Sequence, residues 1–213
     1  MRILGVDPFE EDVPKRAVEA LLEGGLVAFP TDTYYALGAA VWNPEAVARV
    51  FEAKRRPPGD PLPVLAADRA QWETVVADVP EIAQRLADRF WPGALTIVCR
   101  RAPHLSPLVT GGGDTVGVRV PGSPFARALC RALGMPVTGT SANTHGMPPP
   151  VTAAQVALDL GDAVDLILDG GRCPIARPST VIDVTRVPPV IVRPGAVDLR
   201  ALQEVLGEVA SRR

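Results

Sequence analysis

The stretch LILDGGRCPIARPSTVIDVTRVPPVIV, residues 166–192, contains three short apolar runs at 166–168, 181–184 and 190–192. Each run is rich in branched aliphatic residues and is bounded by glycine, proline or polar residues, a pattern typical of buried strands. The runs follow one another too closely for the helical crossovers that parallel neighbours require. The stretch therefore predicts strands with some antiparallel pairing, in a mixed sheet.

Strand and helix signals alternate on the amino-terminal side of this stretch. Further strands are expected at 26–29, 62–66, 94–100, 115–120 and 136–139. Helices are expected at 69–77 and 80–90, and others begin after Pro14, Asn43, Ser123, Thr152 and, past the opening stretch, Asp198. No internal repeat or linker divides the chain. The pattern predicts a single α/β domain over residues 1–213, with a twisted mixed parallel/antiparallel sheet flanked by helices.

The composition is that of an ordinary globular protein, with 213 residues, 47% hydrophobic residues, 22% charged residues and a net charge of -2. This charge argues against a large, uniformly basic surface for nucleic acid, although a local basic cleft stays open. Cys99, Cys130 and Cys173 are isolated and odd in number, so buried thiols are expected. No run approaches the ~18 apolar residues of a membrane span. We expect a cytoplasmic protein with no membrane partner.

Three polar clusters interrupt the apolar pattern: Lys54-Arg55-Arg56, Thr140-Ser141-Ala142-Asn143 and Arg193-Pro194-Gly195. Together their side chains suit an anionic ligand such as a nucleoside triphosphate. The prolines that follow Arg56 imply an unwinding helix, so Lys54 and Arg56 are expected to converge on one ligand and to face solvent in the free protein. Two other readings stay open: the cations complement the helix dipole, and the Ser–Asn segment is a capping turn.

Patterns for metal binding are absent from the sequence. His104 and His145 have no partner at metal-ligand spacing, so both are expected on the surface or in loops. Gly111-Gly112-Gly113 is expected to be a mobile loop, because no phosphate-loop pattern surrounds it. A metal such as Mg²⁺ would therefore arrive with the phosphates of ATP, with no ligand from protein side chains.

Seven segments occur in an order that matches a known family. They are Pro30-Thr-Asp-Thr-Tyr-Tyr-Ala-Leu-Gly38, Lys54-x-Arg56-Pro57, Trp91-Pro-Gly-Ala-Leu-Thr96, Val118-Arg-Val-Pro121, Ser141-Ala-Asn143, Ser179-Thr-Val-Ile-Asp183 and Arg193-Pro-Gly195. This series resembles the YrdC family of threonylcarbamoyl-AMP synthases over about residues 24–197. The resemblance implies a mixed α/β fold with a large concave site. The chain looks like the short, single-domain form of the family.

The implied activity is an ATP-dependent condensation of L-threonine with bicarbonate. It yields threonylcarbamoyl-AMP and pyrophosphate, and the adenylate is then used by downstream tRNA threonylcarbamoyl-transfer proteins to make t6A37. The alternative is a YrdC-like paralogue that binds nucleotide, or RNA weakly, without this activity.

The resemblance also implies roles for single residues. The catalytic pair would be Lys54 and Arg56. With Ser141 and Asn143 they would grip the phosphates of ATP, and further nucleotide contacts would come from Asp60, Thr115 and Arg193. Threonine would be held by Thr33, Arg119 and Ser179, with Arg119 in a bidentate grip on the carboxylate. Positioning and electrostatic stabilisation would suffice, without a protein nucleophile.

The chain departs from the family pattern at four places. Asp60 replaces a usual asparagine, Leu65 a frequent histidine and Pro178 a frequent acidic residue, and the segment 144–152 has an unusual triple proline. We expect this segment to order over the nucleotide as a lid. Threonine is expected to remain the preferred amino acid, because Leu65 suits its methyl group.

Overall fold

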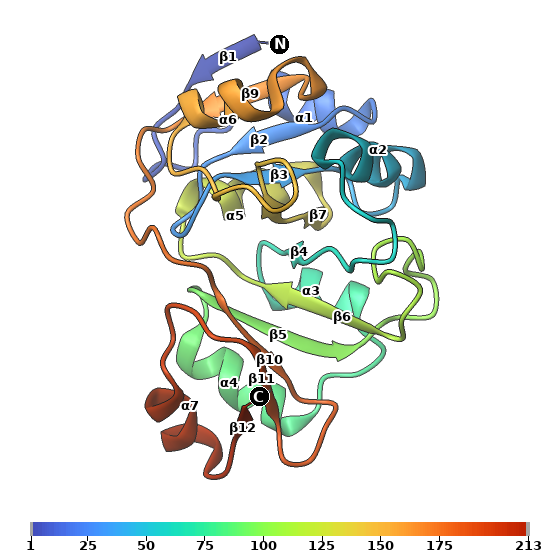
Figure 1. Ribbon diagram of the computed structural model, residues 1–213, viewed down its shortest axis with the longest axis vertical. Coiled ribbons are helices and arrows are strands. Elements are labelled where there is room, and N and C mark those ends of the chain that lie inside the picture. Colours follow the sequence, from blue (N-terminus) through green and yellow to red (C-terminus); the bar gives the residue numbers. More distant parts are fainter. Residues whose placement is uncertain (1, 212–213) are drawn as a thin grey trace.

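The computed structural model describes residues 2–211, and its strands form two sheets. The first sheet occupies the upper part of the view in Figure 1. Its strand order is β1 (Arg2–Gly5), β9 (Leu166–Asp169), β2 (Val27–Phe29), β3 (Ala36–Gly38) and β8 (Thr140–Ser141). Strand β9 is parallel to both β1 and β2, whereas β3 is antiparallel to β2 and β8.

The second sheet lies in the lower part of the same view and is seven-stranded. Its order is β12 (Ala210–Ser211), β11 (Val190–Arg193), β10 (Thr180–Asp183), β5 (Leu95–Arg100), β6 (Thr115–Arg119), β4 (Val64–Leu65) and β7 (Val137–Thr138). Strands β10 and β11 pair antiparallel, as their close spacing predicted, and β10 is parallel to β5. The predicted mixed α/β class is therefore confirmed.

The strands are divided between two sheets, where the sequence predicted one. Only Gly139 separates β7 of the second sheet from β8 of the first. A Cβ atom at Gly139 would lie 2.3 Å from Cγ of Leu65, so only glycine fits this junction without a shift. An isolated antiparallel bridge between Ala40 and Val137 links the sheets again. The two sheets thus meet edge to edge.

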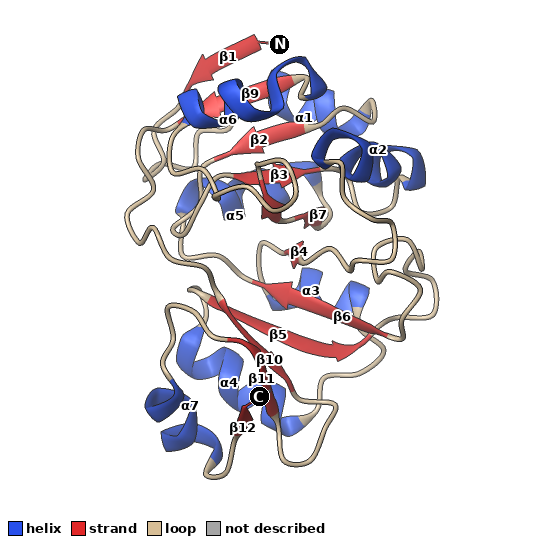
Figure 2. Cartoon of the chain, viewed as in Figure 1, coloured by secondary structure: helices blue, strands red, loops and turns tan. Residues whose placement is uncertain are grey.

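Helices cover both faces of the first sheet (Figure 2). Successive residues of β2 and β9 alternate between two hydrophobic clusters: Val27 and Leu166 face one, Ala28 and Ile167 the other. Helices α1 (Lys15–Leu22) and α5 (Pro124–Leu133) pack in the first cluster, and α2 (Pro44–Lys54) and α6 (Ala153–Leu160) in the second. A short 3₁₀ helix, η1 (Gly161–Ala163), follows α6. Burial on both sides explains why these strands are almost wholly apolar.

The second sheet is covered by helices on one face only. Helices α3 (Arg69–Val75), α4 (Glu81–Phe90) and α7 (Leu199–Leu206) contribute buried residues to the core beneath it. Along β5, Leu95, Ile97 and Cys99 enter this core, whereas Thr96 and Val98 point to the opposite face and line a cavity. Strand β6 alternates in the same way: Val116 and Val118 enter the core, and Thr115 and Gly117 line the cavity.

The predicted helix starts agree with the structure. Asn43, Ser123, Thr152 and Asp198 each accept a hydrogen bond from the backbone N–H three residues later. The helix expected at 69–77 ends early, at Val75. The strands β1, β3, β8 and β12 were not predicted from the sequence. Within residues 2–211, no helix has both the length and the apolar character that a membrane crossing needs.

Candidate functional site

A cavity of about 530 Å³ is lined by residues of both sheets. Its floor is the uncovered face of the second sheet, where β5, β6, β10 and β11 present small and aliphatic side chains. The floor residues include Val98, Gly117, Val181, Val190 and Val192. Polar side chains also line it, among them Thr33, Arg56, Arg119, Ser179 and Arg193. An apolar floor with a few convergent polar groups is the usual form of a small-molecule site.

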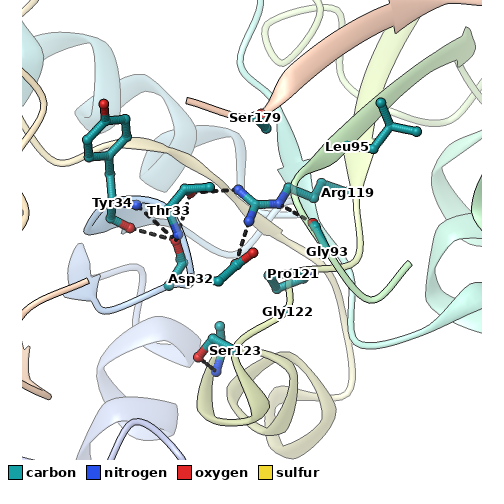
Figure 3. A network of polar contacts seen from close by, with 12 residues as sticks. Asp32, Thr33, Tyr34, Gly93, Leu95, Arg119, Pro121, Gly122, Ser123 and Ser179 are labelled. Carbon is teal, nitrogen blue, oxygen red and sulfur yellow. Dashed lines mark hydrogen bonds and ion pairs between the residues drawn. The ribbon is translucent and has the colours of Figure 1, made fainter. Parts of the chain in front are cut away.

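Arg119, at the end of β6, is the centre of the polar network in Figure 3. Its residue is 5% exposed, and its guanidinium donates from Nε to the Gly93 carbonyl and from Nη1 to Thr33 Oγ1, both at 2.8 Å. Nη2 forms an ion pair with Asp32. Burial lowers the Arg119 pKa, and Asp32 opposes that shift. Of the five N–H donors of an arginine, these contacts leave two for a ligand.

Ser179 lines the same cavity as Arg119 and forms hydrogen bonds with Arg193. The Ser179 hydroxyl lies 2.8 Å from Thr96 Oγ1 and accepts a hydrogen bond from Arg193 Nη2 at 3.0 Å. Arg193 also donates to the Ser179 carbonyl. Burial lowers the Arg193 pKa, and the neighbouring Arg119 lowers it further. Two guanidinium groups thus lie near one another at a single cavity, where anionic groups of a ligand can pair with them.

Arg56 lines the cavity from the loop after α2. Its Nη2 donates to the Pro61 carbonyl at 3.1 Å and lies 3.8 Å from Asp60 Oδ2. Its Nη1 lies 3.5 Å from His145 Nδ1. The buried Nε of Arg56 has no hydrogen-bond partner among residues 2–211. A buried donor without a partner is costly, and because Nε is inaccessible to solvent, a ligand oxygen would reach it only if the Arg56 side chain moved.

Lys54 does not face solvent, contrary to the prediction. Its residue is 1% exposed, and Nζ donates to the backbone carbonyls of Ser141 and Asn143, each at 2.5 Å. The reason is Arg55, whose φ of 51° turns the chain so that Lys54 and Arg56 point to different places. In the free protein the two cations therefore do not both line the cavity, and their convergence on one ligand stays a prediction. Burial, and to a lesser extent the charge of Arg56, lower the pKa of Lys54 to about 7.

The predicted site residues divide into two groups. The cavity lining includes Thr33, Arg56, Thr115, Arg119, Ser141, Ser179 and Arg193. The lining does not include Lys54, Asp60 or Asn143. Asn143 donates from its side-chain amide to the Thr144 and Met147 carbonyls. Its Oδ1 is buried and has no partner within residues 2–211.

Sequence reasoning did not select Asp32 or Thr96, although both contact predicted site residues. The signal for Asp32 was its place directly after the strand at 26–29, beside Thr33. Leu65 and Pro178, two of the departures from the family pattern, line the cavity, as does Pro149 of the segment 144–152.

Among residues 2–211, no group of three or more His, Cys, Asp or Glu side chains is placed to hold a metal ion. His104 lies against the Trp42 ring at 5.2 Å, and His145 lies in a loop beside Arg56. All three cysteines are free and buried, and burial raises the pKa of Cys99 and Cys130 to about 12.

Comparisons with known proteins point in one direction. The model of the Sua5/YciO/YrdC family, described as "Telomere recombination", matches residues 19–195. A threonylcarbamoyl-AMP synthase from Pyrococcus abyssi is 44% identical over 88% of this chain, and one from Bacillus subtilis is 43% identical over 91%. The chain spans 55% and 56% of the length of these two relatives.

A solved structure gives the same result. The crystal structure of P. abyssi Sua5 complexed with L-threonine superposes with a TM-score of 0.96 at 41% sequence identity. The match covers all of this chain and 63% of the other.

Proposed function

The chain belongs to the Sua5/YciO/YrdC family, and from that membership we propose that it is an L-threonylcarbamoyladenylate synthase. L-threonine and bicarbonate would condense to a carbamate with loss of water. A carbamate oxygen would then attack the α-phosphorus of ATP, and pyrophosphate would leave. The observation that carries the proposal is the single cavity in which Arg119, Arg193 and Arg56 lie with Thr33 and Ser179.

The amino acid would bind at the Arg119 end. The two free N–H donors of Arg119 would hold the threonine carboxylate, and the hydroxyls of Thr33 and Ser179 would meet its polar groups. The P. abyssi Sua5 structure complexed with L-threonine supports threonine as the amino acid, because that protein is 41% identical and superposes over the whole of this chain. Leu65 would lie beside the threonine methyl group.

The triphosphate would bind between Arg56 and Arg193, with Ser141 and Thr115 as polar contacts. A carbamate that attacks a phosphate brings two anions together, so cations must screen the charge before bond formation. The position of Arg56 in the cavity lining supports this role. ATP would enter as its Mg²⁺ complex, with the metal held by phosphate oxygens. Asn143 and Asp60 are not part of the cavity lining and would influence the nucleotide through the residues that they contact.

The product would be consumed by a downstream enzyme that transfers the threonylcarbamoyl group to tRNA. The decisive test is therefore formation of threonylcarbamoyl-AMP and pyrophosphate by the purified chain with ATP, bicarbonate and threonine. ATP turnover that does not depend on threonine and bicarbonate would contradict the proposal. RNA binding with a steep salt dependence and without turnover would favour the alternative paralogue.

Amino-acid selectivity gives a sharper test. With threonine, serine and valine at equal concentration, we expect threonine to be used best. Serine lacks one methyl group, whose burial is worth ~0.8 kcal/mol, so discrimination against it should be several-fold. Valine would leave buried hydroxyl groups of the site unpaired and should be rejected more strongly. Mass spectrometry of the three adenylates measures the ratios, and equal use of valine would refute the threonine assignment.

A further inference from the structure

Building on the proposed function, we propose that Asp183 binds the ribose of the nucleotide. Its carboxylate accepts a hydrogen bond from a ribose hydroxyl group, so the site selects ribonucleotides over deoxynucleotides. Asp183 ends the segment Ser179-Thr-Val-Ile-Asp183, of which the proposed function uses only Ser179. Of the described residues that line the cavity, four are arginines and only Asp183 is acidic. A single carboxylate among these cations calls for a ligand group of its own.

The Asp183 carboxylate is fixed by three donors from the turn that follows β10. Oδ1 accepts from the Thr185 N–H at 2.9 Å and from the Thr185 hydroxyl at 2.6 Å, and Oδ2 accepts from Arg186 Nε at 3.1 Å. A carboxylate has about four acceptor sites, so one site on Oδ2 is left. Because the Asp183 side chain is 11% exposed and lines the cavity, a ligand in the cavity can use that site.

Strand pairing places Asp183 one step further along the cavity floor than Arg193. Val181 of β10 is the partner of Arg193, and Asp183 lies two residues further along β10 on the same face. Two residues of a strand span about 7 Å. This length is comparable to the separation between the α-phosphate of a nucleotide and its ribose hydroxyl groups. A nucleotide whose α-phosphate pairs with Arg193 can therefore bring its ribose to Asp183.

The floor beside Asp183 leaves space for a ring. Asp183 is the partner of Val98 in β5, and Val98 is the partner of Gly117 in β6. A Cβ atom on Gly117 would lie 3.1 Å from Cγ2 of Thr96 and 3.6 Å from Cγ2 of Val98. Glycine inside a strand often marks a place where a ligand comes close to the backbone. A sugar can thus lie low over this row, next to the carboxylate.

Charge decides which part of the nucleotide meets Asp183. A carboxylate only accepts hydrogen bonds, and the phosphate oxygens of ATP offer it no donor and repel it. The ribose hydroxyl groups are the first donors beyond the α-phosphate. Asp183 therefore sets the direction in which the nucleotide binds. Because Arg193 lies near Arg119, where threonine would bind, this direction brings the α-phosphate to the carbamate.

Binding of ATP, 2′-deoxy-ATP and 3′-deoxy-ATP to the wild-type protein tests the proposal directly. Isothermal titration calorimetry without threonine and bicarbonate gives the three dissociation constants. We expect at least one deoxy analogue to bind about tenfold or more weakly than ATP, because a hydrogen bond to a charged acceptor is lost. Binding of all three nucleotides within about twofold of one another would overturn the proposal.

Asp183→Asn separates the carboxylate from the turn, since the amide oxygen can still accept from Thr185. We expect the preference for ATP over the deoxy analogue to fall to about threefold or less. Tripolyphosphate has no ribose and should bind at least as tightly as to the wild type. Asp88→Asn, which removes an exposed carboxylate on α4, is the matched control and should keep the wild-type preference.

Two results with Asp183→Asn would contradict the ribose contact. A preference for ATP that persists while all ligands bind more weakly would reduce Asp183 to a turn residue. Weaker binding of the Mg²⁺ complex of tripolyphosphate would assign the carboxylate to the metal. The wild-type comparison does not depend on this variant, so the proposal stays testable if Asp183→Asn does not fold.

The titrations use no turnover and are therefore independent of the test of the proposed function. Formation of threonylcarbamoyl-AMP together with equal binding of ATP and both deoxy analogues would overturn the ribose contact alone. A preference for ATP that depends on Asp183, without formation of threonylcarbamoyl-AMP, would remove the proposed function and keep the ribose contact.

Discussion

At the scale of single residues, the Arg119 guanidinium is fixed by more contacts than are needed to keep a positive charge in the cavity. Gly93, Thr33 and Asp32 use three of its donors and fix the plane of the guanidinium. Gly122 leaves room for Asp32, because a Cβ atom there would lie 2.9 Å from Asp32 Oδ2. The ligand therefore meets an arginine that has already lost its rotamer freedom, which lowers the entropic cost of binding.

Asp32→Asn is expected to raise the threonine KM about tenfold or more and to change the ATP KM little. The reason is that a hydrogen bond to a charged group contributes ~1.5–3 kcal/mol, and its loss lets Arg119 leave the productive plane. Steady-state kinetics with each substrate varied in turn measures both constants. Asp88→Asn, which removes the exposed partner of Arg69, is the control and should change neither. An unchanged threonine KM in Asp32→Asn would argue against this role.

The lowered pKa of Lys54 predicts how the free energy of unfolding depends on pH. Its folded-state pKa is about 7, below the 10.5 of an ordinary lysine, so the unfolded state binds more protons between these values. The free energy of unfolding should therefore rise as pH increases from 7 to 8.5, by about 1 kcal/mol per pH unit. Urea unfolding at several pH values tests this, and Lys54→Met should flatten the profile. A wild-type profile that falls over this range would contradict the shift.

The sequence predicted which residues line the cavity better than it predicted where their side chains point. Thr33, Arg119 and Ser179 come from three separate motifs, and all of them line one cavity. The orientation of Lys54 could not be predicted, because it depends on the positive φ of Arg55. An arginine in the sequence gives no sign that its backbone is left-handed.

At the scale of elements, hydrogen bonds near both ends restrain the segment 144–152, so it cannot move as a lid over its whole length. Thr144 is bound to Asp159, the Pro150 carbonyl accepts from the Tyr35 N–H, and Val151 donates to Gln155. The side chains of Thr152 and Gln155 form a capping box at the start of α6. In the middle of the segment, the His145 and Met147 N–H groups donate to the carbonyls of Lys54 and Thr144, so closure over a nucleotide would have to break or rearrange these bonds.

Hydrogen exchange with and without ATP is therefore expected to change at 145–147 and to stay the same at 151 and 152. The prolines at 148–150 have no backbone N–H and report nothing themselves. The helix-start amides of α2 provide the internal control, since they lie away from the cavity. Unchanged protection at 145–147 on ATP binding would count against a lid.

Helix starts were predictable because capping residues act locally. Asn43, Ser123, Thr152 and Asp198 all cap the helices that follow them. The strands that were missed are short: β3 has three residues and β12 has two. Such strands are defined by the strands that pair with them, β2 and β8 for β3 and β11 for β12, and two or three residues carry too little local pattern to reveal that pairing.

At the scale of the whole molecule, the two sheets are interleaved along the chain. The first sheet takes β1–β3 and then β8 and β9, and the second takes β4–β7 and then β10–β12. Neither sheet is built from one continuous piece of sequence. The division into two sheets was not predictable, since it depends on the backbone at Gly139 and on a bridge between distant residues.

Interleaving predicts that the chain unfolds as one cooperative unit, in agreement with a single domain over residues 1–213. The buried side chain of Trp72 packs against Trp91 in a T-shaped arrangement, with ring centroids 4.8 Å apart, so tryptophan fluorescence reports on the second sheet once Trp42 is replaced by phenylalanine. Far-ultraviolet circular dichroism reports on both. We expect the two urea transitions to coincide within error. Separate midpoints would indicate two independently folding parts.

The position of β9 has a consequence for synthesis of the chain. Strand β9 lies between β1 and β2 in the first sheet, but it begins only at Leu166, whereas β2 ends at Phe29. At ribosomal rates of about 5–20 residues per second, the nascent chain carries β2 for on the order of ten seconds before its central partner exists. A β2–β3 hairpin can form early, yet the other edge of β2 stays open to pairing with foreign strands. The chain is therefore most prone to aggregation before it leaves the ribosome, and this risk ends when residues 166–169 dock.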